Sequence, residues 1–463
     1  MTSGQRYLDQ ELKIRYRVIQ APKNNKEIVL AAEQGILASI EFQMSLLMFV
    51  ALAGYLIAYR INQSAVVGII LAGIIVGPSL LGLVTYTEFV SSLGHLGAVV
   101  LLFTIGLHFN IKEIVNIKYF VIASAGIIVP WISGFYLAKA FGFDFGASIF
   151  VGTALTATSI AITANVLKEM GKLQTKAARA VIGAAIIDDI LSLLALSISR
   201  GLVSGDLTLP AIIITISKAI GFLAIGSFLG SMVLSRTMIW LDNTRFCGKY
   251  PEAIFIFAIM VAFLYSLVAE LVGLSAIIGS FLAGVTLTRV KLRHEEAFRE
   301  GAEHLQIIFA SIFFISLGIL LDLHVITLDL LWFILALTIV AFLTKFLGCG
   351  VPSKLQGIGT RDSLIVGVGM IPRGEVAMII ALIGLNQNLI MQDTYAALVL
   401  MSLLTTVIPP LILRNWLFKG KKQESKITGR HVQSLKEHKS HNVRLPKVVS
   451  RKWWKKDTTR DRN

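Results

Sequence analysis

Long apolar runs follow one another along most of this 463-residue chain, and they constrain its fold more than any other feature. A helix needs about 20 consecutive apolar residues to cross the hydrocarbon core of a bilayer. Thirteen runs qualify, of which the third and the ninth are short; they lie near residues 36–59, 64–83, 91–107, 119–138, 146–167, 178–199, 210–235, 251–269, 273–288, 304–321, 330–351, 362–385 and 394–417. The sequence therefore predicts an all-α membrane protein with about 13 transmembrane helices.

Composition excludes several other classes of protein. Hydrophobic residues make up 55% of the chain and charged residues only 15%, against roughly 25% charged in a typical soluble domain. The two cysteines, Cys247 and Cys349, are too few for a disulfide framework. Because the sequence contains no Walker A motif, HExxH motif or nucleophile elbow, we expect neither an enzyme nor an ATP-driven pump, and no cofactor.

The basic residues of the loops indicate the orientation of the helices. Loops after odd-numbered runs hold 16 Lys and Arg, counting Arg179 at the very start of the sixth run, whereas loops after even-numbered runs hold 2. Since basic loops stay on the cytoplasmic side, we expect the odd loops and the C-terminus to be cytoplasmic and the N-terminus to lie outside. The polar, basic extension 1–35 fits poorly with an external position.

A basic tail, residues 418–463, follows the last apolar run. Its residues 419–463 carry +11 of the chain's formal net charge of +15. Behind a membrane domain, such a segment favours anionic lipid at the cytoplasmic surface. We expect no nucleic acid as a partner.

Two adjacent carboxylates, Asp188 and Asp189, lie near the middle of the sixth run. Each ionised carboxylate there costs about 2.5–3.5 kcal/mol on insertion scales, and such residues are functional by default. Adjacent helical residues point about 100° apart, so one carboxylate can face an ion cavity while the other meets a partner. The pattern predicts a cation and proton site; the alternative is a structural acid pair bound to a neighbouring Arg or Lys.

The fifth run contains the segment TALTATS, from Thr153 to Ser159. Its hydroxyls compete with helical hydrogen bonds and weaken the helix. A broken helix at membrane depth frees backbone carbonyls, which is tolerated where they line a cavity or meet protein. Oxygen ligands of this kind suit a hard cation such as Na⁺. Hydrogen bonding between helices is the alternative interpretation.

The twelfth run contains a second weak point, GMIPRGEVAMI, from Gly369 to Ile379. Pro372 lacks a backbone donor and Gly374 loosens the helix. Arg373 and Glu375 are two residues apart and would not face each other on a regular helix. We therefore expect both charges to stabilise a second broken helix. A direct ligand role for Glu375 is the alternative.

Lys345 lies in the eleventh run, within FLTKFLG. Its ammonium could pair with one of the two aspartates, or it could snorkel to the interface. The two weak helices are seven runs apart, so the segments around them begin on opposite sides of the membrane. That arrangement is typical of an inverted repeat with its site at the midplane.

These segments together resemble a known family. GYLIAYRINQSAVVGIILAGIIVGPSLLGLV, LLFTIGL, TALTATS, IIDDI, LSAIIGSFLAG, FFISLGI and PRGEVAMI, in this order, resemble the bacterial NapA/Kef-like branch of the monovalent cation:proton antiporters over residues 36–417. The resemblance implies a homodimer in the bacterial inner (plasma) membrane whose six-helix core moves like an elevator. It places the scaffold at 36–107 and 210–322 and the core at 118–200 and 329–417.

The resemblance also implies roles for individual residues. Asp189 would bind the transported Na⁺, and Asp188 would pair with Lys345. Thr158 and Ser159 would help to coordinate the ion. Arg373 and Glu375 would stabilise the crossing of the two broken helices.

The double aspartate resembles the Na⁺/H⁺ members of the family, whereas potassium-efflux members tend to carry Gln-Asp. We therefore expect exchange of Na⁺ or Li⁺ for H⁺. K⁺/H⁺ exchange is the alternative within the family, and a passive monovalent cation channel is the alternative from another class. A non-transporting membrane scaffold is disfavoured, because it would gain nothing from costly buried charge.

Overall fold

The computed structural model describes residues 39–109, 116–205, 209–288, 290, 292–321, 323–325 and 328–418. These residues are helical with irregular connections and contain no β-strand, which confirms the all-α class. The helices are α3 (Ile40–Arg60), α4 (Ala65–Val76), α5 (Glu88–Gly106), α7 (Ile117–Ala140), α8 (Phe145–Ala154), α9 (Ile160–Glu169), α10 (Lys176–Ser204), α11 (Leu209–Leu229), η1 (Gly230–Leu234), α12 (Ser235–Asp242), α13 (Arg245–Lys249), α14 (Glu252–Leu271), α15 (Ala276–Leu287), α16 (Glu295–Ile319), η2 (Leu323–Val325), α17 (Leu328–Leu355), α18 (Thr360–Gly369), α19 (Glu375–Asn386), α20 (Gln392–Ile412) and η3 (Leu413–Leu417). The extension 1–35 and the tail from Lys419 lie outside the described residues.

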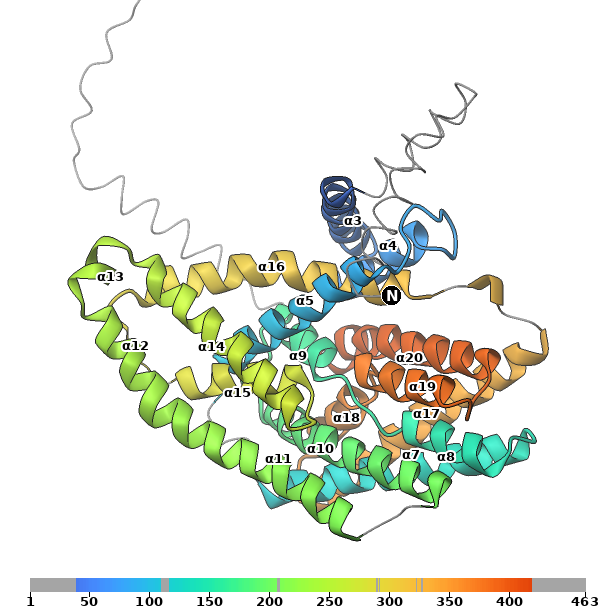
Figure 1. The fold of residues 1–463 in the computed structure, drawn as a ribbon. Coiled ribbons are helices and arrows are strands. Elements are labelled where there is room, and N and C mark those ends of the chain that lie inside the picture. Colours follow the sequence, from blue (N-terminus) through green and yellow to red (C-terminus); the bar gives the residue numbers. More distant parts are fainter. Residues whose placement is uncertain are drawn as a thin grey trace, which may run out of the picture. The chain divides into compact units, whose positions relative to one another are not determined.

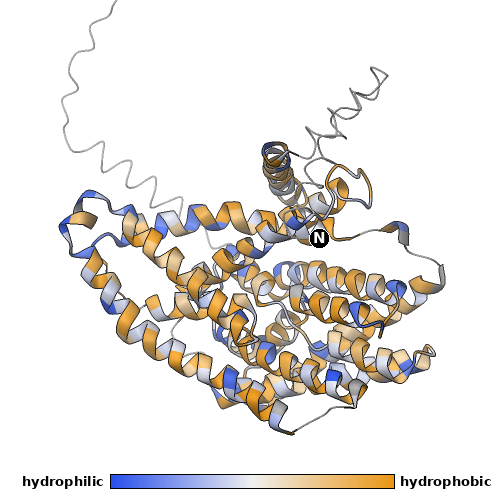
Figure 2. Cartoon of the chain, in the orientation of Figure 1, coloured by the Kyte–Doolittle hydropathy of each residue, from blue (hydrophilic) through white to orange (hydrophobic). Residues whose placement is uncertain are grey.

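Nine helices in the described part are long and apolar enough to cross a membrane, and four further apolar helices have 10–17 residues. Many large hydrophobic side chains on these helices are exposed. Hydrophobic residues make up most of each helix, while hydrophilic residues gather at places such as the region of α13 (Figure 2). Apolar surface of this extent requires a lipid environment. The chain is an integral membrane protein, and the count of 13 spans stays a prediction.

Two of the expected run lengths were wrong. The second run forms only the 12-residue helix α4, because Gly77 is extended and is followed by Pro78, which disfavours helical backbone in the residue before it. The third run forms the full 19-residue helix α5. It begins at Glu88, three residues before the expected run 91–107.

The helices form two packing groups (Figure 1). In the first group, α5 packs against α15 and α16, α4 against α3 and α16, and α14 against α15. In the second group, α17 packs against α7, α18 and α20, and α8 against α7 and α19. The division into a scaffold (36–107 and 210–322) and a core (118–200 and 329–417) stays a prediction.

Close backbone approach holds the first group together. Gly106 on α5 and Gly284 on α15 face each other, and a Cβ on either one would collide with a backbone carbonyl oxygen of the other helix. Small residues of this kind let membrane helices pack closely. The helix α9 joins the two groups, since it contacts α4 and α5 on one side and α10 and α20 on the other.

Candidate ion-binding site

The first broken helix consists of α8 and α9. Residues 155–159, between the two halves, are not helical. The hydroxyl of Thr156 donates to the carbonyl oxygen of Thr153 at 2.7 Å, and the hydroxyl of Thr153 donates to that of Ile149 at 2.8 Å. The threonine hydroxyls thus bind main-chain carbonyl oxygens at the end of α8, as expected for hydroxyls that compete with helical hydrogen bonds in TALTATS.

The second broken helix consists of α18 and α19. Residues 370–374 interrupt it, and Pro372 lies in the middle of the interruption. Both breaks are buried among other helices, as backbone at membrane depth must be when it leaves the helical pattern. The sequence prediction of two broken helices is confirmed.

The two breaks contact each other directly. The Ser159 amide donates to the Pro372 carbonyl oxygen at 2.7 Å. The Thr158 hydroxyl donates to the Met370 carbonyl oxygen at 3.3 Å. One turn into α9, Thr163 donates to Gly369 at 2.6 Å. Backbone groups freed by one break are thus satisfied by the other, and the crossing point is fixed.

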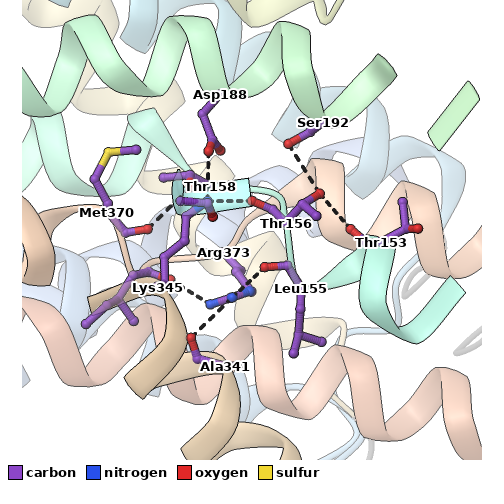
Figure 3. A network of polar contacts seen from close by, with 12 residues as sticks. Thr153, Leu155, Thr156, Thr158, Asp188, Ser192, Ala341, Lys345, Met370 and Arg373 are labelled. Carbon is purple, nitrogen blue, oxygen red and sulfur yellow. Dashed lines mark hydrogen bonds and ion pairs between the residues drawn. The ribbon is translucent and has the colours of Figure 1, made fainter. Parts of the chain in front are cut away.

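Arg373 fills the space between the breaks and is fully buried. Its Nη2 donates to the carbonyl oxygens of Leu155 at 2.6 Å and Ala341 at 3.3 Å, and its Nη1 donates to that of Ile371 at 3.1 Å (Figure 3). Leu155 caps the C-terminus of α8, where the helix dipole favours a positive charge. Arg373 therefore neutralises the partial negative charge at the crossing.

Lys345 reaches the same region from α17 and is also fully buried. Its Nζ donates to the Asp188 carboxylate at 2.8 Å, to the Gly126 carbonyl oxygen at 2.9 Å and to the Thr156 carbonyl oxygen at 2.5 Å. All three ammonium protons thus have an acceptor. The structure places Lys345 against Asp188 and away from the interface to which it could have snorkelled.

The aspartate pair lies in the middle of α10, and both side chains are buried. Thr158, from the first break, lies within hydrogen-bonding reach of Asp188 (Figure 3). Asp189 is the next residue and points about 100° around the helix. Two carboxylates then balance two cations, Lys345 and Arg373, when all four are ionised.

Glu375 is the first residue of α19, and its side chain lies outside the described part of the structure. Gly374, immediately before it, lies against Ser159: a Cβ at Gly374 would be 2.7 Å from the Ser159 hydroxyl oxygen. The structure therefore brings together Asp188, Lys345, Thr158 and Arg373, and it places Ser159 at the edge of the second break.

Sequence reasoning missed several residues of this network. Ser199 and Ser192 on α10 lie 2.6 Å from the Thr153 hydroxyl and 3.4 Å from the Thr156 hydroxyl. Thr406 on α20 donates to the Arg373 carbonyl oxygen. Ser192 lies one turn after Asp188, so helical spacing could have indicated it. Nothing in the sequence around Thr406 singles it out.

Comparison with known proteins places this site in a family. The family model described as sodium/hydrogen exchanger, transmembrane, matches residues 46–419. The chain belongs to this family. Its members are transporters, so the protein is not an enzyme, and the predicted relationship to monovalent cation:proton antiporters is confirmed. The finer assignment to the NapA/Kef-like branch stays a prediction.

Individual relatives cover most of the chain. The Na⁺/H⁺-K⁺ antiporter GerN of Bacillus cereus is 33% identical over 81% of this chain and 95% of its own length. An Na⁺/H⁺ antiporter of Enterococcus hirae is 34% identical over 80% of this chain and 96% of its own. The sodium proton antiporter MjNhaP1 of Methanocaldococcus jannaschii is similar in structure, with a TM-score of 0.64 at 14% identity, over 88% of this chain and 100% of that one. The last likeness concerns the fold alone.

Gly126 tests how tightly the site is packed. A Cβ at this position would lie 2.5 Å from Cys349 Sγ, and 3.8 Å from both Asp188 Oδ1 and Lys345 Nζ. We expect Gly126→Ala to lower the free energy of unfolding by about 1–3 kcal/mol, because inserting a methyl group into a packed core strains it. A thermal melt of the purified protein in detergent measures this effect.

Two further variants serve as controls: one adds a methyl group where there is space, and the other removes the atom with which the new methyl group collides. Gly221 on α11 has no heavy atom within 4 Å of an added Cβ, so Gly221→Ala should not lower the melting temperature, since alanine is the better helix former. Adding Cys349→Ala to Gly126→Ala removes the colliding sulfur and should restore most of the loss. A Gly126→Ala variant as stable as the wild type would contradict the packing described above.

Proposed function

We propose that the protein exchanges Na⁺ for H⁺ across the membrane, with Asp189 as the residue that carries either ion. The observation that carries the proposal is the network at the crossing of two broken helices, in which Asp188 is bound to Lys345 at 2.8 Å. Asp188 binds an internal cation, and Asp189 is the second buried carboxylate of the pair, so the proposal assigns the exchange to Asp189. The relatives' names support Na⁺ and H⁺ as the transported ions.

The charges of the network suggest why the two ions compete. When Asp189 is ionised, adding one proton or one Na⁺ gives the four groups the same net charge. Carboxylate, hydroxyl and carbonyl oxygens are ligands for a hard cation, and Thr158 and Ser159 offer such oxygens beside the aspartates. In this proposal a proton leaves Asp189 on the more alkaline side, and Na⁺ or Li⁺ takes its place.

Movement between the two sides would follow the division of the helices. The second packing group holds α8, α18, α19 and α10, and α9 links it to the first group. This supports an elevator-type motion of the core (118–200 and 329–417) against the scaffold (36–107 and 210–322). The helix stretch Ile212–Asp242 has little of its surface buried, which is consistent with a homodimer.

The proposed setting is the inner (plasma) membrane of a bacterium. The charges of the loops favour a cytoplasmic C-terminus. There, the basic tail from residue 418 would meet anionic lipid.

Proteoliposomes with an imposed inside-acid pH gradient test the exchange. A pH-sensitive dye inside the vesicles is followed while Na⁺, Li⁺ and K⁺ are added outside in turn. We expect Na⁺ and Li⁺ to dissipate the gradient, because each can displace the proton from Asp189. K⁺ belongs in the series because the relative GerN is named for Na⁺, H⁺ and K⁺.

Other outcomes would redirect the proposal. Dissipation by K⁺ alone would keep an antiporter but reverse the choice of ion. Cation currents without proton movement would indicate a passive channel. Protein-free liposomes, treated in the same way, give the background leak of each ion.

A further inference from the structure

Polar contacts between the two helix groups gather at one end of the structure. Five such pairs are Glu169 with Ser64, Gln306 with Asn165, Asn415 with Gln63, Arg414 with Asn62, and Gln174 with the His108 carbonyl oxygen. By the loop-charge argument this is the cytoplasmic end. Asn165 and Glu169 lie on α9, and Gln174 lies in the segment between α9 and α10. Residues of α9 therefore make two of these five contacts.

Glu169, the last residue of α9, caps a helix of the other group. The N-cap residue of α4, Ser64, makes no side-chain hydrogen bond to its own helix. Its hydroxyl instead donates to Glu169 Oε2 at 2.5 Å, and the Ala65 amide donates to the same oxygen at 3.1 Å. A helix N-terminus has unsatisfied amides and favours a negative charge. A carboxylate 105 residues away in sequence thus supplies the cap of α4.

The other carboxylate oxygen of Glu169 joins a third helix to this contact. Asn165, one turn earlier on α9, donates to Oε1 at 3.0 Å. Gln306 on α16 donates to Asn165 at 3.3 Å and accepts from Lys168. A cavity of about 300 Å³ lies beside these groups and is lined by all four helices α3, α4, α9 and α16. Oε2 therefore holds α9 against α4 directly, whereas Oε1 orients Asn165, which in turn contacts Gln306 of α16.

The opposite end of α9 is part of the ion-binding site. The helix starts directly after Ser159, whose amide binds Pro372 at the crossing of the two breaks. Ten helical residues span about 15 Å, so the short helix α9 connects the crossing of the two breaks directly to the N-terminus of α4. A shift at Glu169 would be transmitted to Thr158 and Ser159.

We infer that Glu169 is a positioning residue for ion binding: by capping α4, it fixes α9 and thereby places the Thr158–Ser159 end of the broken helix beside the aspartate pair. This inference rests on the proposed function for the meaning of the ion site. It goes further in giving a residue outside that site a role in ion affinity.

The charges around Glu169 are consistent with a carboxylate held by donors. Burial raises the pKa of Glu169 above its ordinary value, whereas the hydrogen bonds from Ser64 and Ala65 and the charge of Arg414 lower it. Lys168 precedes it on α9, and Glu303 on α16 lines the same cavity. The hydrogen bonds and the cation together oppose the effect of burial on the ionised side chain.

The test separates positioning from simple capping. In proteoliposomes, we expect Glu169→Ala to raise the apparent KM for Na⁺ about tenfold, which corresponds to about 1.4 kcal/mol. Amide hydrogen exchange should become faster in residues 160–169 and 64–68, because both helix ends lose their contact. In the double variant Glu169→Ala/Ser64→Asp, the new aspartate caps α4 locally but cannot hold α9. The double variant should restore slow amide hydrogen exchange in residues 64–68 but not in α9, and its apparent KM for Na⁺ should stay high.

Glu303→Gln is the matched control, because Glu303 is an acidic residue of the same cavity and lies outside the contacts just described. This variant should leave the apparent KM for Na⁺ and the amide hydrogen exchange of α9 unchanged. Recovery of the KM in the double variant would reduce Glu169 to a structural cap and overturn the inference, as would a wild-type KM in Glu169→Ala. If the wild type transports no cation, the proposed function fails. Amide hydrogen exchange in α9, compared between the wild type and Glu169→Ala, still reports whether Glu169 holds that helix.

Discussion

Asp189→Asn is expected to abolish Na⁺-dependent proton movement in proteoliposomes, down to the level of protein-free vesicles. Asparagine has nearly the same shape as aspartate but neither binds a proton at physiological pH nor offers a negative charge to Na⁺. Since Asp188 is bound to Lys345 at 2.8 Å, we do not expect Asp188 to take over the exchange. The dye assay with Na⁺ and Li⁺ measures the loss.

Asp188→Asn is the natural comparison for this result, since it removes the same charge one residue away. We expect it to retain part of the exchange but to change its dependence on membrane voltage, because the charge moved per cycle includes the Asp188–Lys345 pair. Exchange retained in Asp189→Asn would show that this residue is not the ion carrier. An unchanged voltage response in Asp188→Asn would remove Asp188 from the count of moving charges.

The second large effect concerns stability. Lys345→Met is expected to lower the free energy of unfolding by about 3–5 kcal/mol, because removing one partner of a buried ion pair leaves the other uncompensated. Both side chains are fully buried, and the carbonyl oxygens of Gly126 and Thr156 lose their donor as well. Thermal unfolding in detergent gives the effect, measured at matched protein and detergent concentrations.

Two further variants decide the cause of that loss. In Lys345→Met/Asp188→Asn the uncompensated charge is gone, so a large part of the stability should return. Lys354 lies nine residues further along α17, exposed, and donates to Thr360 at 2.6 Å; Lys354→Met should change stability by less than about 0.5 kcal/mol. If the double variant were as unstable as Lys345→Met alone, the ion pair would not be the reason.

The sequence predicted those features that depend on local chemistry. Threonines and a serine in TALTATS, and Pro372 beside Gly374, weaken a helix wherever it lies, so both breaks could be placed within a few residues. The aspartate pair could be singled out because carboxylates in an apolar run are costly whatever surrounds them. The same reasoning failed at the ends of the second and third runs, because Pro78 ended α4 early and α5 begins at Glu88, before the expected run 91–107.

The partners of these residues depended on the tertiary structure. Arg373 binds main-chain carbonyls of Leu155, Ile371 and Ala341. Because every residue has a main-chain carbonyl, the sequence does not indicate which of them Arg373 binds. Glu169 meets Ser64 across 105 residues, and only the packing of α9 between the two helix groups brings them together. The sequence alone thus determined where the helices break and where charge is buried, because both follow from the properties of single residues. Which charge meets which partner was decided by the fold, since that depends on distances between helices far apart in the chain.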